Sequence, residues 1–248
     1  MPYVPDTILN LYAKVQGLLD RSKRSWLAAC EAWNEEPPSR IATPATTTEV
    51  LLGPLTGIFV KPAAVALTRA QSVAGVSSDG SRLIIWADAS RKKDTTGFAV
   101  AFLTGSNWVR VTAKGHATPT DVAELKAICL ALDYAVQVTK IQKGSIDTLR
   151  SVEVFTDSQS ALGLLRVTNR PMVTAGSHGN AQGGNPRTKR GVRKRTIEKV
   201  CVMVDELQEA GVMVELHWVP RGKVTGNVIA DKGAAIARMG LTSYHTPH

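Results

Sequence analysis

The order of apolar runs and amphipathic stretches between residues 81 and 240 constrains the fold of this chain more than any other feature. Three strand-like segments come first, at Leu83 to Trp86, Gly97 to Leu103 and Asn107 to Lys114. Apolar runs and alternating patterns of this length are typical of β-strands, and Gly105-Ser106 supplies a tight turn between the second and the third. The three segments predict an antiparallel meander.

Helices and strands alternate in the rest of this region. Apolar residues recur at helical spacing over 121–138, 158–166, 196–210 and 227–239, and strand-like runs cover 151–156 and 212–219. The order β-β-β-α-β-α-α-β-α predicts an α/β fold, in which helices pack on a mixed sheet.

The remaining segments carry weaker signals. Helical spacing from Asp6 to Glu36 predicts an N-terminal helical extension over 1–36, and prolines then break the pattern. We expect a linker or irregular segment at 37–80, the main domain at 81–240, an insertion at about 170–195 within a Gly/Ser/Asn-rich stretch, and a tail at 241–248.

Composition limits the classes of function. The formal net charge of +9 favours a polyanionic partner over an acidic protein substrate. The cysteines, Cys30, Cys129 and Cys201, have no CxxC spacing, which argues against a disulfide framework and a structural zinc site. No secretory signal or long apolar segment is recognisable, so we expect an intracellular protein of the cytoplasm or nucleus that does not enter a membrane.

Four acidic residues stand at positions where chemistry is expected. Asp88 and Asp157 end predicted strands, Glu124 lies one turn into a predicted helix, and Asp231 lies in the first turns of the last helix. Four acids from separate segments can converge only if a cation offsets their repulsion, and Mg²⁺ and Mn²⁺ prefer such oxygen ligands. Two such ions, roughly 3.5–4 Å apart, can activate a water and stabilise the leaving oxygen of a phosphodiester.

Five sequence blocks around these acids resemble those of type 1 ribonuclease H. They are Ile85-Trp86-Ala87-Asp88-Ala89-Ser90, Gly97-Phe98-Ala99-Val100, Ala123-Glu124-Leu125-Lys126-Ala127-Ile128, Val154-Phe155-Thr156-Asp157-Ser158-Gln159, and Trp218-Val219-Pro220 with Gly226-Asn227 and Ala230-Asp231. The resemblance spans 81–240 and is closest to the ribonuclease H domains of retroelement polyproteins, particularly fungal LINE-like elements.

The resemblance implies both a fold and an activity. The fold is a five-stranded mixed sheet, with three antiparallel strands and then two parallel ones, flanked by helices. The activity is endonucleolytic hydrolysis of the RNA strand of RNA/DNA hybrids with two Mg²⁺ ions, for which Mn²⁺ can substitute. The catalytic, metal-binding acids fall on Asp88, Glu124, Asp157 and Asp231.

Each acid also has a structural interpretation when it is taken alone. Asp121 and Glu124 fit a capping box, in which the glutamate bonds back to the start of its helix. Asp157 could be the N-cap of the helix that follows it, and Asp231 could complement a helix dipole. Asp88 could be a turn residue. The joint pattern favours the catalytic interpretation, because four independent caps would not be expected to reproduce one family's motif order.

The candidate nucleic-acid-binding residues are mostly basic. A run at 187–195, placed just before the helix predicted from Thr196, can follow a phosphate backbone, although it is also typical of a solvated loop or a nuclear-localisation patch. The complete set is Ser90, Ser158, Gln159, Arg187, Lys189, Arg190, Arg193, Lys194, Arg195, Arg221 and Lys223.

The chain departs from the family pattern at several positions. The family usually has a mobile histidine after the Trp-Val-Pro block, whereas Arg221 follows here, and neither it nor Lys223 can relay a proton near neutral pH. We therefore expect slower turnover. Asp121 stands where the family commonly has an asparagine, and an acid there either repels phosphate or caps the helix. His217 is interpreted as a structural histidine.

A second function stays open on these departures. The chain could be a catalytically impaired, retroelement-derived module that keeps the fold and binds nucleic acid or a protein. The N-terminal helices could contact a reverse transcriptase or another protein, or mediate dimerisation. The expected principal partner is an RNA/DNA hybrid.

Overall fold

The computed structural model describes residues 57–78, 80–142, 148–168 and 189–240. The predicted N-terminal helices, residues 170–188 of the predicted insertion and the predicted tail lie outside the described residues. No helix within the described ranges combines the length and the apolar character needed to cross a bilayer.

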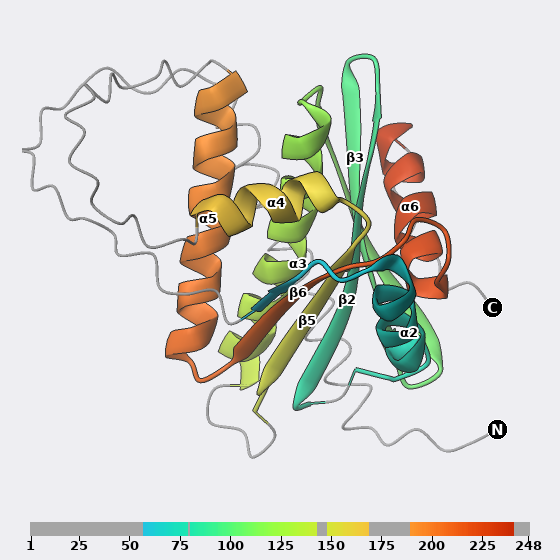
Figure 1. Ribbon diagram of the computed structural model, residues 1–248, viewed down its shortest axis with the longest axis vertical. Coiled ribbons are helices and arrows are strands. Elements are labelled where there is room, and N and C mark those ends of the chain that lie inside the picture. The colour runs from blue at the N-terminus through green and yellow to red at the C-terminus, as the bar shows by residue number, and fades with distance from the viewer. Residues whose placement is uncertain (1–56, 79, 143–147, 169–188, 241–248) are drawn as a thin grey trace, which may run out of the picture. The chain divides into compact units, whose positions relative to one another are not determined.

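The described residues form a six-stranded mixed sheet (Figure 1). Its strands are β1 (Gly57–Phe59), β2 (Arg82–Lys92), β3 (Thr95–Thr104), β4 (Asn107–His116), β5 (Ser151–Thr156) and β6 (Met213–Trp218), in the spatial order β1-β6-β5-β2-β3-β4. The pairs β2–β3 and β3–β4 are antiparallel, whereas β5 pairs parallel with β2 and with β6. The predicted fold class is confirmed, with one correction: β1 pairs parallel with β6 and adds a sixth strand to the five expected.

Helices cover both faces of this sheet (Figure 1). On one side lie α3 (Thr120–Gln142), α4 (Gln159–Thr168) and α5 (Lys189–Glu209), and on the other lie α2 (Ala63–Ala74) and α6 (Thr225–Arg238). Helix α3 packs on β2, β3 and β5 and is covered in turn by α4 and α5. This double packing explains why its buried residues extend around most of its circumference instead of forming one stripe.

Helices α2 and α6 share one apolar core with the face of the sheet that they cover. Trp86 and Phe155, on neighbouring strands, stack with their ring centroids 4.6 Å apart. Ala70 and Val73 of α2 and Ala230 of α6 belong to the same buried cluster. Helix α2 is therefore an integral part of the domain.

This packing changes the boundary expected from the sequence. β1 and α2 fall within 37–80, which was predicted to be a linker or an irregular segment. Strand β1 has only three residues, and the buried positions of α2 are Ala66, Ala70 and Val73. Such small side chains contrast weakly with their neighbours, so the helical period is faint in the sequence. The ordered domain begins at least as early as Gly57.

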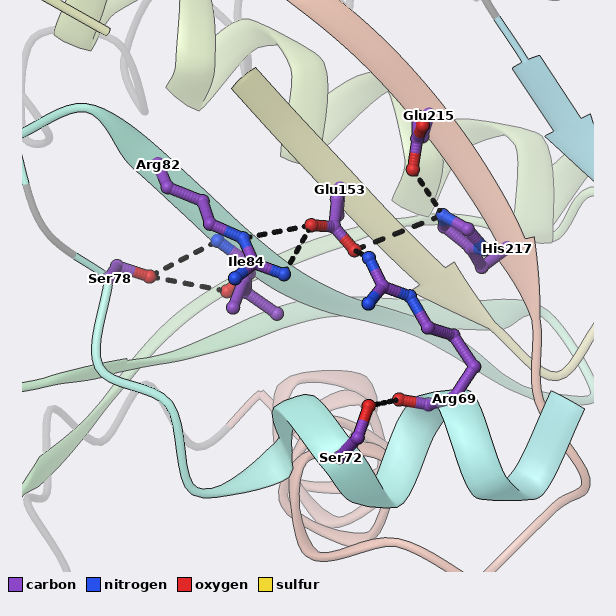
Figure 2. Close-up of polar contacts among 8 residues, drawn as sticks. All are labelled: Arg69, Ser72, Ser78, Arg82, Ile84, Glu153, Glu215 and His217. Carbon is purple, nitrogen blue, oxygen red and sulfur yellow. Dashed lines mark hydrogen bonds and ion pairs between the residues drawn. The ribbon is translucent and has the colours of Figure 1, made fainter. Parts of the chain in front are cut away.

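A buried carboxylate ties α2 to the sheet. Glu153, in the middle of β5, has a side chain only 6% exposed. It accepts hydrogen bonds from Arg69 Nη2 at 2.6 Å and from Arg82 Nη2 and Nε at 2.6 and 2.9 Å. Figure 2 shows Arg69 extending from α2 toward Glu153, while Arg82 approaches it from the start of β2. Two guanidinium groups thus satisfy a charge that would be costly to bury alone.

Two glycines allow α6 to lie close to the sheet. A Cβ atom on Gly97 of β3 would be 2.0 Å from the carbonyl oxygen of Ala234. A Cβ atom on Gly226, in the first turn of α6, would be 2.3 Å from the indole of Trp86. No larger residue fits either position unless the helix moves, and this close approach holds Asp231 of α6 beside the sheet.

Candidate active site

Asp88 and Asp157 lie at the same edge of the sheet. Asp157 comes directly after β5, as predicted, but Asp88 does not end its strand, because β2 continues to Lys92 in its hairpin with β3. The pairing of β2 with β5, however, stops at Trp86. Asp88 therefore lies just beyond the parallel pairing, at the carboxyl ends of both strands, where open α/β sheets commonly bind ligands.

The structure brings the four predicted acids together. Carboxylate oxygens of Asp88, Glu124 and Asp157 all lie within 4.8 Å of one another. Glu124 enters from the second turn of α3, and the backbone N–H of Ala89 donates to its carboxylate. Asp231 on α6 lies close enough to Asp88 for its charge to raise the pKa of that carboxyl group.

Burial makes this cluster electrostatically unusual. Asp88 is fully buried, and among the described residues no N–H or O–H group donates to either of its carboxylate oxygens. Burial, followed by the charges of Asp157 and Asp231, raises the pKa of Asp88 to about 8. Burial also raises the pKa of Glu124 well above its usual value, with further contributions from Asp88 and Asp157.

These residues fit a divalent cation. Buried carboxylate oxygens without donors are costly, and the cost is relieved by protonation or by a bound cation. The donor set consists of carboxylate oxygens, which suits Mg²⁺ and Mn²⁺ better than softer metals. Asp88, Glu124, Asp157 and Asp231 are the residues that could hold such ions.

Arg221 lies against this cluster. Its Nε donates to Asp157 Oδ2 at 2.7 Å, and this hydrogen bond, with the charge of Asp157, raises the pKa of the guanidinium. The loop that carries it is anchored at both ends. The indole N–H of Trp218 donates to the carbonyl of Asp157 at 3.1 Å, and the backbone N–H of Gly222 donates to Asn227 Oδ1 at 2.9 Å.

Trp218 and Asn227 were not among the residues predicted for the site. Both lie in sequence blocks that resemble the family, and this was the only signal available. Asn227 is only 1% exposed, and its amide oxygen holds the turn at Gly222, where φ is +67°. Both residues thus position Arg221 and Asp157. Among the described residues, neither forms a hydrogen bond to the carboxylates of the other three acids.

The structural interpretations of Asp157 and Glu124 are not supported. The N-cap of α4 is Ser158, whose hydroxyl accepts the N–H of Ala161 at 3.2 Å. The carboxylate of Glu124 is bonded to Ala89 of β2 and not to the start of its own helix. Asp121, the other member of the expected capping box, forms an ion pair with Arg193 of α5.

The predicted nucleic-acid-binding residues have different outcomes. The basic run was expected to precede a helix starting at Thr196, but α5 begins at Lys189, so residues 189–195 of the run form the first two turns of that helix. Within it, Arg190, Lys194 and Arg195 are exposed and Arg193 is paired with Asp121, while Arg187 lies outside the described residues. Gln159 and Lys223 are exposed, and Ser90 and Ser158 are half-buried.

A second group of potential metal ligands lies elsewhere. Glu153, Glu215 and His217 also have ligand atoms within 4.8 Å of one another. Glu153 is already bonded to two arginines, and His217 Nε2 lies 2.9 Å from a carboxylate oxygen of Glu215 (Figure 2). The imidazole stacks between Phe59 and Phe155, at centroid distances of 4.7 and 4.9 Å, and its burial lowers its pKa. These contacts agree with the interpretation of His217 as structural.

Comparisons with known proteins gave structural likenesses only. No protein-family model matches the chain, and no curated protein sequence is similar to it. A crystal structure of RNase H1 from the halophilic archaeon Halobacterium salinarum is 17% identical, with a TM-score of 0.39 over 63% of this chain and 97% of that one. A foamy viral protease-reverse transcriptase in complex with dsDNA is 15% identical, with a TM-score of 0.39 over 65% and 95%. The same foamy viral protein with an RNA/DNA hybrid is 13% identical, with a TM-score of 0.40 over 83% and 23%.

Proposed function

We propose that this protein is a divalent-metal-dependent endonuclease that hydrolyses the RNA strand of RNA/DNA hybrids. The observation that carries the proposal is the convergence of four acids from β2, α3, the residue after β5, and α6. Both oxygens of Asp88 are buried and without a donor among the described residues. The resemblance of the surrounding sequence to type 1 ribonuclease H supplies the substrate class.

Each acid has a role in the proposed reaction. Asp88 and Asp157 would hold the cations, Glu124 would contribute to one ion, and Asp231 would complete the second. Divalent cations bound there would supply an activated water and would stabilise the leaving oxygen of the phosphodiester. The water oxygen bonds to phosphorus and the bond to the ribose 3′ oxygen breaks, which leaves a 3′-hydroxyl on one product and a 5′-phosphate on the other. The rigid edges of β2 and β5 keep the two aspartates in position.

The surroundings of the site support binding of a nucleic acid. The exposed side chains of Arg190, Lys194 and Arg195 in the first turns of α5 would contact phosphates and make affinity fall with salt. The ion pair with Arg193 offsets the charge of Asp121, which reduces the repulsion of phosphate expected at that position. Arg221 and Lys223 would contact phosphate nearer the acids.

The wider context rests on the resemblance alone. We propose a retroelement origin and an intracellular setting, in the cytoplasm or the nucleus, with a reverse transcriptase as a partner for the N-terminal region. The alternative is an impaired module that binds without cleaving. The hydrogen bond between Arg221 and Asp157 supports this alternative, because it occupies one of the acids at the place where the family has its mobile histidine.

Cleavage of an end-labelled RNA/DNA hybrid in Mg²⁺ and in Mn²⁺ tests the proposal. The expected result is cleavage of the RNA strand with 3′-hydroxyl ends, absent in EDTA and lost in Asp157→Asn, while double-stranded and single-stranded RNA stay intact. Asp94→Asn, which changes an exposed acid in the β2–β3 turn, is the matched control and should cleave normally. Hybrid binding in EDTA without cleavage in either metal would favour the alternative.

A further inference from the structure

Arg221 and a divalent cation require the same carboxylate. Asp157, whose side chain is only 4% exposed, belongs to the group of acids that can hold a metal, yet its Oδ2 accepts the Arg221 Nε–H at 2.7 Å. The charges of Asp88 and Glu124 also act on the guanidinium. In the structure, the guanidinium of Arg221 thus already supplies positive charge to these acids.

The Arg221 side chain can leave without disturbing its loop. The loop is held by the backbone bond of Val219 to Thr156, by the indole of Trp218 and by Asn227, none of which involves the guanidinium. Asp157 is the only hydrogen-bond partner found for the guanidinium among the described residues, and the Arg221 side chain is 70% exposed. Moving it therefore costs one half-exposed ion pair and no backbone rearrangement.

We propose that Arg221 is an internal counter-cation, which competes with divalent metal for Asp157 in the free protein and transfers to a backbone phosphate when nucleic acid binds. The inference rests on the proposed function, because it takes the four acids to be the metal site. In this proposal, Arg221 is a positioning residue that couples the binding of metal to the binding of nucleic acid.

The coupling follows from charge balance. A phosphate offers the guanidinium two oxygens and a bidentate geometry, whereas Asp157 accepts a single bond through Nε. When the arginine moves to the phosphate, Asp157 is free to bind a cation, and the cation offsets the charges of the remaining acids. Each ligand thus makes the binding of the other more favourable, as thermodynamic linkage requires.

Mn²⁺ binding to the free protein tests the competition directly, with unbound Mn²⁺ measured by electron paramagnetic resonance. Arg221→Gln removes the competing charge, and we expect Mn²⁺ to bind about three- to tenfold more tightly, as expected for the loss of a partly exposed ion pair. Lys223→Gln removes an equal charge two residues away in the same loop, and we expect it to change Mn²⁺ affinity less than twofold. Equal effects of the two substitutions, or unchanged affinity in Arg221→Gln, would overturn the inference.

Hybrid binding in EDTA, measured by fluorescence anisotropy, tests the transfer of Arg221 to a backbone phosphate. Cleavage cannot interfere, because EDTA removes the metal. Arg221→Gln should bind the hybrid at least about threefold more weakly, with a salt slope reduced by about one. Unchanged hybrid affinity would overturn the transfer to phosphate. If wild-type protein neither binds Mn²⁺ in an Asp157-dependent way nor cleaves hybrids, the proposed function fails and the inference with it. If it does both and only the Arg221 effects are missing, the inference alone fails.

Discussion

Replacing Asp88 by asparagine should make the metal-free protein more stable while it abolishes cleavage. Below about pH 3.8 this carboxyl is protonated in the folded and the unfolded state, and between there and about pH 8 only the unfolded state ionises it. Unfolding then releases a proton, so the free energy of unfolding falls as the pH rises through this window. At about 1.36 kcal/mol per pKa unit, the full difference is roughly 5 to 6 kcal/mol.

The neutral amide should recover part of this free energy. The raised pKa of Asp88 depends in part on the neighbouring acids, and the pKa of Glu124 is raised with it, so the gain belongs partly to the whole cluster. We expect Asp88→Asn to add about 2 kcal/mol to the free energy of unfolding at pH 8, and less than about 1 kcal/mol at pH 5. For a domain of this size, the first figure corresponds to a rise in Tm of about 4 to 8 °C.

Thermal unfolding in EDTA at pH 5 and pH 8, followed by circular dichroism, measures both values. Mg²⁺ should then raise the Tm of the wild type more than that of Asp88→Asn, because it binds the folded protein. Asp94→Asn, at an exposed position, should leave the Tm nearly unchanged at both pH values. An Asp88→Asn protein no more stable than wild type at pH 8, or a gain equal at the two pH values, would refute the reasoning.

Two further substitutions test the packing that supports the site. Glu153→Gln leaves Arg69 and Arg82, whose side chains are 43% and 32% exposed, without their carboxylate. We expect the free energy of unfolding, measured by urea denaturation, to fall by about 1 to 3 kcal/mol. A change below about 0.5 kcal/mol would contradict the importance of the network. Gly97→Ala places a Cβ against the backbone of α6, so it should lower the free energy of unfolding by about 2 kcal/mol or more and slow cleavage. Gly163→Ala, with no atom within 4 Å of its Cβ, should raise the free energy of unfolding by about 0.5 to 1 kcal/mol. Similar effects of the two substitutions would contradict the tight contact at Gly97.

The regular part of the fold could be predicted because local pattern and tertiary structure agree there. Strand β5 occupies the predicted residues, and α3 begins one residue earlier and ends four residues later than predicted. The end of β2 was predicted too early, because the hairpin partner in β3 extends the strand through Asp88 into a polar segment. The apolar pattern in a sequence ends where the strand stops being buried, whereas hydrogen-bonded pairing with a neighbouring strand can continue beyond that point.

The convergence of the four acids could be expected only from their joint motif order. Local reading gave Asp157 and Glu124 plausible capping roles, and the contacts that exclude those roles come from Ser158 and Ala89. The bond of Arg221 to Asp157 joins residues 64 positions apart in the sequence. No periodicity or spacing encodes such a pair, since it depends on how β6 and the loop after it lie beside β5.

The short strand β1 has a consequence for the behaviour of the domain in solution. Without it, β6 would be the outermost strand, and its backbone groups at Glu215 to His217, which now pair with β1, would be open to a strand from another molecule. A chain shortened to begin at residue 81, where the recognisable motifs start, would keep all four acids but lose β1 and α2. We expect such a fragment to associate through the bared strand, so the segment that carries β1 would protect the domain from aggregation.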